Sequence, residues 1–314
     1  MKAIGYTASK PIDQDDSLFD FEMEAPSPKG HDLLVRVQAI SVNPVDYKIR
    51  MRRASEDGQP VVLGWDAVGV VEAVGDKAKA FKPGDSVWYA GAIDRPGTNA
   101  ELHLVDERIV GRKPTSASSA EAAALPLVSL TALQALRDEA RIEAGHSLCI
   151  NGASGGVGTM AVQIGKILGA EVTAVSSAEN HDFLRELGAD HCLDYRQVDI
   201  SKQERRYDIF FDVFGNQPFK QIKPILSARG VWVSTVLKRH VYDSVAQSKI
   251  SGGKKAKMVI VHASRPDLER VSAWVASGRL KPIIHALFPL DRIQEAQAQQ
   301  ETKHSRGKIV VSIP

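Results

Sequence analysis

The sequence predicts an α/β protein with a β-rich first unit and a second unit built on a doubly wound parallel sheet. In roughly the first 120 residues, short apolar and β-branched stretches alternate with turn signals. From residue 119 onward, segments rich in alanine and leucine at helical spacing alternate with short apolar runs. A length of 314 residues allows two domains that each bury a core of their own.

Two apolar stretches are the clearest strands of the first unit. Residues 33–42 and 67–74 are rich in valine, leucine and isoleucine, and Gly75 ends the second stretch. Turn signals at 56–60 and 82–85 combine glycine and proline with acidic residues. We therefore expect an all-β unit with little helix.

Strands and helices alternate regularly in the second unit. Its expected strands lie at residues 147–151, 171–175, 209–213, 230–236 and 258–261. The helix after the first strand places Val157, Ala161, Ile164 and Leu168 on one face, and Gly169 supplies a stop. This rhythm is typical of a doubly wound parallel sheet.

Composition narrows the class of protein. Hydrophobic residues make up 43% and charged residues 25% of the chain, and a formal net charge of +2 gives no electrostatic reason to expect a nucleic-acid partner. The N-terminus has no apolar signal core, and no run of about 18 apolar residues suggests a membrane span. The two cysteines, Cys149 and Cys192, suit buried, reduced thiols, so we expect a cytoplasmic protein without a disulfide.

A glycine-rich turn follows the first strand of the second unit and runs directly into the amphipathic helix. Glycine lets the backbone approach a pyrophosphate, and the helix N-terminus favours its negative charge. We expect the cofactor to contact Ala153, Ser154, Gly155, Gly156, Val157 and Gly158. A tight turn without a ligand and a methyltransferase-type sheet remain alternatives.

The next strand favours NADPH over NADH. An acidic residue about 20 positions after the first glycine would bind the ribose hydroxyls of NAD, whereas this strand ends in Ser176 and Ser177. Hydroxyl donors suit a 2′-phosphate, although Glu179 lies close by and could repel it. Tyr195 and Arg196 follow a further short strand and can approach the same phosphate, or Arg196 can be an ordinary surface residue.

Several segments together resemble the quinone oxidoreductase branch of the medium-chain dehydrogenase/reductase superfamily. The resemblance covers nearly the whole chain and is carried by the glycine turn and by residues 41–46, 64–71, 81–87, 129–132 and 306–310. It implies a GroES-like catalytic domain over 1–120, to which 268–314 return, and a Rossmann NADP-binding domain over 121–267. It also implies a homodimer joined at edge strands, for which 258–261 is the expected edge.

The resemblance further implies roles for single residues. Asn43 and Thr131 would approach the nicotinamide end of the cofactor, although Thr131 can equally cap or pack a helix. Phe214, Gly215 and Val236 would line the cofactor path, with strand core as the alternative for Val236. Lys308, in the matching C-terminal segment, joins the cofactor-binding set.

Zinc members of the superfamily bind the metal through a cysteine near 41–46, a histidine near Trp65 and a further cysteine or aspartate. No cysteine stands at those positions here, and Asp66 with His103 would make a poor zinc site. We therefore expect no metal and a zinc-independent reaction.

Without a Lewis acid, the expected chemistry is hydride transfer from NADPH to a quinone or an α,β-unsaturated carbonyl. Asn43, Asp46 and Tyr47 are the expected catalytic residues, with Tyr47 and Asp46 as proton donors and solvent as a rival donor. A structural phenol at a domain edge is the alternative for Tyr47. Trp65 and Asp66 are expected to line the acceptor pocket, or Trp65 is simply core. A non-catalytic NADPH-binding sensor or structural protein and a zinc-type alcohol dehydrogenase are the alternative functions.

Overall fold

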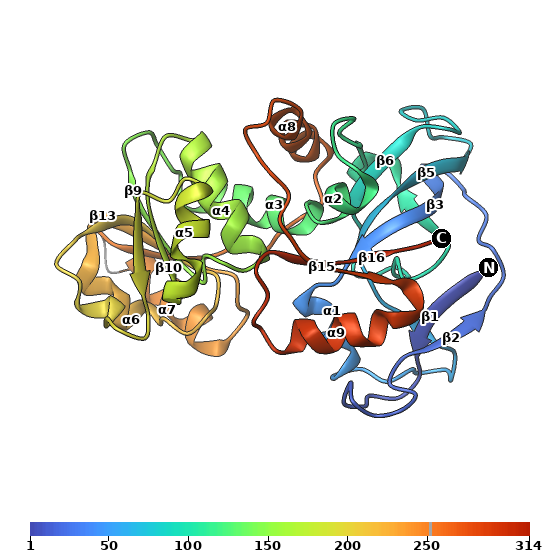
Figure 1. Cartoon of the computed structure of the whole chain (residues 1–314), viewed down its shortest axis with the longest axis horizontal. Helices are drawn as coiled ribbons and strands as arrows, with labels where there is room; N and C mark the ends of the chain where they lie inside the picture. Colours follow the sequence, from blue (N-terminus) through green and yellow to red (C-terminus); the bar gives the residue numbers. More distant parts are fainter. Residues whose placement is uncertain (251–252) are drawn as a thin grey trace. The chain divides into compact units, whose positions relative to one another are not determined.

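The computed structural model describes residues 1–250 and 253–314, which form two compact units. The first unit comprises Met1–Leu127 and Ala263–Pro314, and the second comprises Val128–His262. In Figure 1 the blue N-terminal strands and the red C-terminal strands accordingly belong to the same unit.

The first unit is built on two sheets. Its strands are β1 (Lys2–Tyr6), β2 (Phe19–Glu22), β3 (Asp32–Ser41), β4 (Val61–Val62), β5 (Asp66–Val74), β6 (Ser86–Ala90), β7 (Leu102–Asp106), β8 (Gly111–Arg112), β15 (Ile284–Pro289) and β16 (Lys308–Ser312). The larger sheet has the order β15-β16-β3-β5-β6-β8, with β7 also paired to β3, and the smaller has the order β2-β1-β4. The antiparallel pairing of Val310 with Ser41 joins the C-terminal strand to β3.

The expectation of little helix holds for the first 118 residues, whose helical segments are one short α-helix and one 3-10 turn. The unit contains α1 (Pro44–Arg50), α2 (Ser119–Ala123), α8 (Arg265–Ala276) and α9 (Ile293–Glu301). Of these, α1 lies inside the stretch expected to be all-β. Pro44 opens it at the position where a missing N–H costs nothing, and the Asp46 carboxylate accepts a hydrogen bond from the Asn43 backbone N–H at 2.6 Å.

The second unit contains a six-stranded parallel sheet. Its strands are β9 (Ser147–Asn151), β10 (Glu171–Ser176), β11 (His191–Asp194), β12 (Tyr207–Asp212), β13 (Leu226–Ser234) and β14 (Lys255–Met258). Their order, β11-β10-β9-β12-β13-β14, places the first strand in the middle and reverses the direction of winding there, which is the doubly wound arrangement. The helices are α3 (Pro126–Gln134), which starts in the first unit, α4 (Gly156–Ile167), α5 (His181–Glu186), α6 (Phe219–Ile222) and α7 (Arg239–Ile250).

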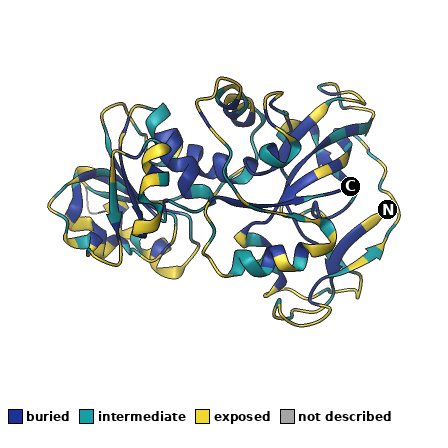
Figure 2. Cartoon of the chain, viewed as in Figure 1, coloured by how far each residue is buried: buried dark blue, intermediate teal, exposed yellow. Residues whose placement is uncertain are grey.

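Burial explains why most of these strands could be expected. The interior strands β9 and β10 are covered on both faces, and all but their first residues are buried (Figure 2). The expected position of the last strand is wrong. The strand β14 covers Lys255–Met258, so only Met258 of the expected range 258–261 belongs to it. Phe210 and Trp232, from neighbouring strands, are fully buried in one core cluster.

Both cysteines are free thiols, with Cys149 buried in β9 and Cys192 partly buried in β11. Within residues 1–250 and 253–314, no helix has the length and apolar character needed to span a bilayer.

Candidate cofactor site and active-site cluster

The glycine turn lies between the end of β9 and the start of α4. Gly152 has φ +85°, a conformation that favours glycine, and Gly155 caps the helix. A Cβ on Gly158 would lie 2.2 Å from the Gly152 carbonyl oxygen, so the helix packs directly against the turn. A Cβ on Gly155 would meet only that oxygen, at 3.8 Å, which leaves open space above the turn. The turn therefore fits a pyrophosphate placed at the first-turn amides of a 12-residue helix.

A buried hydrogen-bond network, which the sequence analysis missed, supports this turn from β12. The Asn151 amide donates to Asp212 Oδ1 at 2.7 Å and to Asn216 Oδ1 at 2.8 Å. Asp212 also accepts the backbone N–H of Gly215 at 2.9 Å and that of Gln217 at 3.0 Å. Burial raises the pKa of Asp212, and these donors oppose the rise. The sequence signal for this network is Asp212 itself, a carboxylate at the end of the parallel strand next to β9.

The network holds the loop that contains Phe214 and Gly215. A Cβ on Gly152 would lie 3.1 Å from the Phe214 Cβ, and one on Gly215 would lie 2.4 Å from the Val236 side chain. The structure thus brings Phe214, Gly215 and Val236 together with the glycine turn. Phe214 remains 54% exposed, which leaves its ring available for contact. Thr131 is a buried residue of α3, and its role toward the cofactor stays a prediction.

The ends of β10 and β11 bring together the residues expected at the ribose. Ser176 Oγ donates to Ser154 Oγ at 2.9 Å, and the Asn180 amide donates to the hydroxyls of Ser176 and Ser177 at 3.2 and 3.0 Å. Asn180 was missed in the sequence because an amide in a loop carries no special pattern. Arg196 lies over the ring of the exposed Tyr195, with 5.7 Å between the guanidinium carbon and the ring centre.

A second polar cluster lies in the first unit around Asp66 and Lys308. Asp66 Oδ2 accepts Ser41 Oγ at 2.7 Å and the Asn43 amide at 2.8 Å. The Lys308 ammonium donates to Asn43 Oδ1 at 2.6 Å and to the Val42 carbonyl oxygen at 2.7 Å, and it lies 3.6 Å from Asp66 Oδ2. Burial lowers the pKa of Lys308, and the neighbouring Asp66 and Asp46 oppose that shift. All four side chains are buried, so Asn43 is held tightly in place by its neighbours.

Asp46 lies beside this cluster at the start of α1. One carboxylate oxygen accepts the Asn43 N–H, and the backbone N–H of Gly64 also approaches the buried carboxyl closely enough to oppose a rise of its pKa. Complete burial raises the pKa of Asp46 to about 7; the Asn43 N–H and the Lys308 charge oppose the rise, and the Asp66 charge adds to it. Asp46 can therefore hold a proton near neutral pH.

Tyr47 and Trp65 are the sequence neighbours of Asp46 and Asp66. Tyr47 is half-buried, and its pKa is raised by burial and by the nearby Glu301 of α9. Glu301 forms an ion pair with the buried Arg50, which fixes α1 against α9. Trp65 is buried, and its indole N–H donates to the Ala92 carbonyl oxygen at 3.0 Å. Trp65 is therefore tied to the loop that follows β6.

The donors of this region do not fit zinc. Asp66 and Asn43 offer oxygen atoms, but both already bind the ammonium of Lys308, whose positive charge would repel a metal ion. His103 uses both ring nitrogens, toward the Tyr89 hydroxyl and the Pro96 carbonyl oxygen, each at 3.0 Å. Burial lowers the pKa of His103 to about 4. Across the described part of the chain, no three His, Cys, Asp or Glu side chains are grouped as metal ligands.

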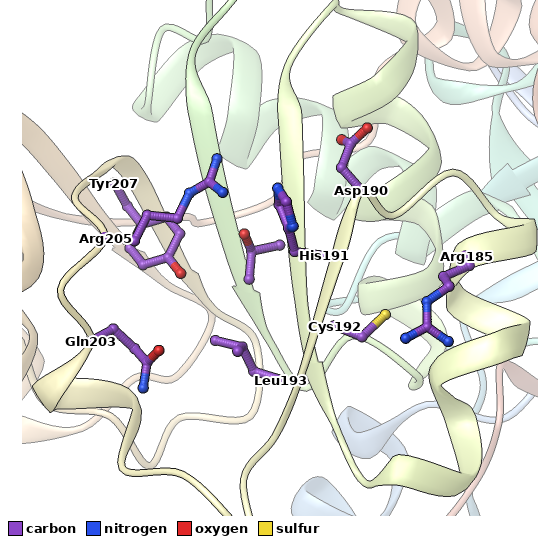
Figure 3. A pocket seen from close by; sticks show the side chains of 9 residues that line it. Arg185, Asp190, His191, Cys192, Leu193, Gln203, Arg205 and Tyr207 are labelled. Atoms are coloured by element: carbon purple, nitrogen blue, oxygen red, sulfur yellow. The ribbon is translucent and has the colours of Figure 1, made fainter.

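A cavity of about 360 Å³ lies elsewhere in the second unit. Its lining includes Thr173, His191 and Tyr207, which stand near the starts of β10, β11 and β12. Figure 3 shows Tyr207 and Arg205 on one side of β11 and Cys192 on the other. Ligands of open parallel sheets bind at the carboxyl ends of the strands, where the glycine turn lies, so this cavity is not the candidate site.

Comparison with known proteins gives the class. Residues 29–127 match the family model of the alcohol dehydrogenase GroES-like domain, and residues 187–311 match that of the zinc-binding dehydrogenases. The chloroplast envelope quinone oxidoreductase homolog of Arabidopsis thaliana is 32% identical over 303 residues, which cover 92% of each chain. The chain belongs to the medium-chain dehydrogenase/reductase superfamily and is an oxidoreductase, and the expected pairing of a GroES-like domain with a Rossmann sheet is confirmed.

Within the superfamily, the resemblance to quinone oxidoreductases is also confirmed. The structure of the quinone oxidoreductase from Coxiella burnetii has a TM-score of 0.91 and 28% identity, and the match covers 100% of this chain and 99% of that one. A zinc-type alcohol dehydrogenase-like protein of Staphylococcus epidermidis is 42% identical over 212 residues, which span 65% of this chain and 62% of that protein. Rossmann domains of this superfamily bind nicotinamide cofactors.

Proposed function

We propose that the protein is an NADPH-dependent reductase that transfers hydride to a quinone or an α,β-unsaturated carbonyl without zinc. The buried cluster of Ser41, Asn43, Asp66 and Lys308 carries this proposal. It supplies a fixed positive charge from a lysine side chain, and its donors do not suit a metal. The zinc-type name of one relative describes that protein and not the donors present here.

In the proposal, the cofactor is held by the glycine turn, by Ser176 at the end of β10 and by Ser177 directly after it. Ala153, Ser154, Gly155, Gly156, Val157 and Gly158 bind the pyrophosphate, and Ser176, Ser177 and Tyr195 bind the phosphorylated ribose. Reduced NADP, when bound, supplies the hydride. The side chains of Phe214 and Val236, together with Gly215, exclude water along the cofactor. Asp212 keeps the loop of Phe214 and Gly215 in place through the contacts described above.

The first unit supplies the acceptor side of the reaction. Asn43, fixed by Lys308 and Asp66, orients the reacting groups, and Trp65 limits the acceptor pocket. Tyr47 is half-buried and can donate a proton to the developing enolate or phenolate. Asp46 is only 2% exposed, so we do not expect it to touch the acceptor. We assign it the role of a buried group that holds a proton next to Asn43.

The test is a substrate screen that follows NADPH absorbance, with and without a chelator. We expect oxidation of NADPH by quinones or enones, unchanged by the chelator and faster than with NADH. Alcohol oxidation with NADP⁺ that the chelator abolishes would instead identify a zinc dehydrogenase. Tight NADPH binding with no acceptor reduced would identify a non-catalytic binding protein.

A further inference from the structure

Glu179 occupies an unusual position beside the expected ribose site. It belongs to a single 3-10 turn, Ala178–Asn180, directly after Ser177. Its Oε1 accepts a hydrogen bond from the Ser177 hydroxyl at 2.9 Å, and its Oε2 lies 3.3 Å from a guanidinium nitrogen of Arg196. One carboxylate thus contacts a hydroxyl from the end of β10 and a cation from beyond β11.

These two partners are groups that a 2′-phosphate would use. A carboxylate can only accept, so the Ser177 hydroxyl donates its single hydrogen to Glu179, while the Ser177 oxygen accepts from the Asn180 amide. Arg196 is a cation at this edge and lies over Tyr195. In the absence of cofactor, an anion of the chain's own therefore satisfies both donors.

We propose that Glu179 stands in for the 2′-phosphate and sets the preference between NADPH and NADH. This inference rests on the proposed function, which places the adenosine ribose at these residues. NADPH must displace the carboxylate from Ser177 and Arg196, whereas NADH brings no competing anion. Glu179 therefore weakens NADPH binding and narrows the difference between the two cofactors.

The balance of charges makes the displacement feasible. The side chains of Glu179 and Arg196 are 63% and 56% exposed, and exposed ion pairs of this kind are weak. A phosphate monoester carries more negative charge than a carboxylate and offers three acceptor oxygens. Arg196 therefore exchanges a carboxylate for an anion of larger charge, and the displaced side chain of Glu179 can turn into solvent.

The test compares the cofactor affinities of the wild type and Glu179→Gln, measured by calorimetry without an acceptor. Glutamine keeps the size and the oxygen that accepts from Ser177 but removes the charge. We expect NADPH to bind about three- to tenfold more tightly to Glu179→Gln, the range of an exposed ion pair plus relieved repulsion. NADH affinity should change less than about twofold, because NADH lacks the phosphate.

Asp182→Asn is the matched control. Asp182 lies three residues further on, its side chain is 95% exposed, and it pairs with Arg185 rather than with Arg196. Its removal takes away the same charge and should leave the ratio of the two affinities unchanged. An equal effect of both variants, or an unchanged ratio in Glu179→Gln, would overturn the inference.

Failure of the proposed function would look different. It would appear in the wild type itself, as a preference for NADH or as no binding of either cofactor. A wild type that prefers NADH but whose ratio shifts toward NADPH in Glu179→Gln would contradict the proposed cofactor and still support the role of Glu179.

Discussion

At the scale of single residues, the buried carboxyl of Asp46 links the cluster to pH. Complete burial disfavours its ionised form by more than the Asn43 and Gly64 N–H groups and the Lys308 charge favour it. The folded-state pKa of about 7 lies above the usual value of 3.8. The folded protein thus binds the proton more tightly than the unfolded chain does, and stability is lost as pH rises from the lower value through the higher one.

Asp46→Asn should remove this dependence. The free energy of unfolding of the wild type should fall relative to the variant as pH rises toward about 7, by at most about 1.4 kcal/mol per pH unit. Urea unfolding at several pH values measures the difference. Asp243→Asn, at an exposed position of α7, is the control and should follow the wild type. Parallel profiles for Asp46→Asn and wild type would show that Asp46 does not titrate in this range.

At the scale of elements, α4 owes its position to two glycines with different tasks. At Gly158 an added Cβ would meet backbone atoms of Gly152 and Ala153, between 2.2 and 2.7 Å away, which cannot move aside cheaply. At Gly155 the nearest atom would be 3.8 Å away, and φ is −76°. One glycine is needed for packing, and the other leaves space.

Gly158→Ala should therefore destabilise the protein by about 1–3 kcal/mol, as overpacking of backbone does. Gly155→Ala should fold with nearly wild-type stability and bind NADPH more weakly, since its methyl group enters the proposed pyrophosphate site. Thermal unfolding together with cofactor titration separates the two effects. Wild-type stability in Gly158→Ala would contradict the close packing of α4 on the turn.

The strands and helices differ in how well their positions follow from the sequence. The strand β9 was expected at its observed bounds because strands buried on both faces read as continuous apolar runs. The edge strand β14 was missed because lysines alternate along it and a stronger apolar run follows. The start of the short helix α1 has a local signal, Pro44 followed by Asp46 after the N-cap Asn43, whereas its ion pair from Arg50 to Glu301 depends on the complete fold. The cluster joining Asn43 to Lys308 needs the complete fold, since 265 residues separate them.

At the scale of the whole molecule, the edge of the parallel sheet is the expected site of self-association. Among the described residues, β14 pairs with β13 and with no strand on its other side. The lysines that would discourage pairing are engaged within the chain, since Lys255 donates to the Ser248 carbonyl oxygen and Lys257 pairs with Glu139. Ile260, just beyond the strand, is 69% exposed.

We expect light scattering to give twice the monomer mass, and Ile260→Lys to shift the protein toward monomer. Ile93→Lys is the matched control, because Ile93 is similarly exposed, at 61%, but belongs to the first unit. A monomeric wild type, or dissociation caused equally by both variants, would contradict association through this edge.

The interleaving of the first unit has a consequence for biosynthesis. Lys308 leaves the ribosome 265 residues after Asn43, a delay on the order of tens of seconds at usual rates of translation. During that interval the strands of the parallel sheet have all been made, while Asp66 still lacks the lysine that balances its charge. The nascent chain can therefore fold its second unit first, and the first unit is completed only when β16 joins β3.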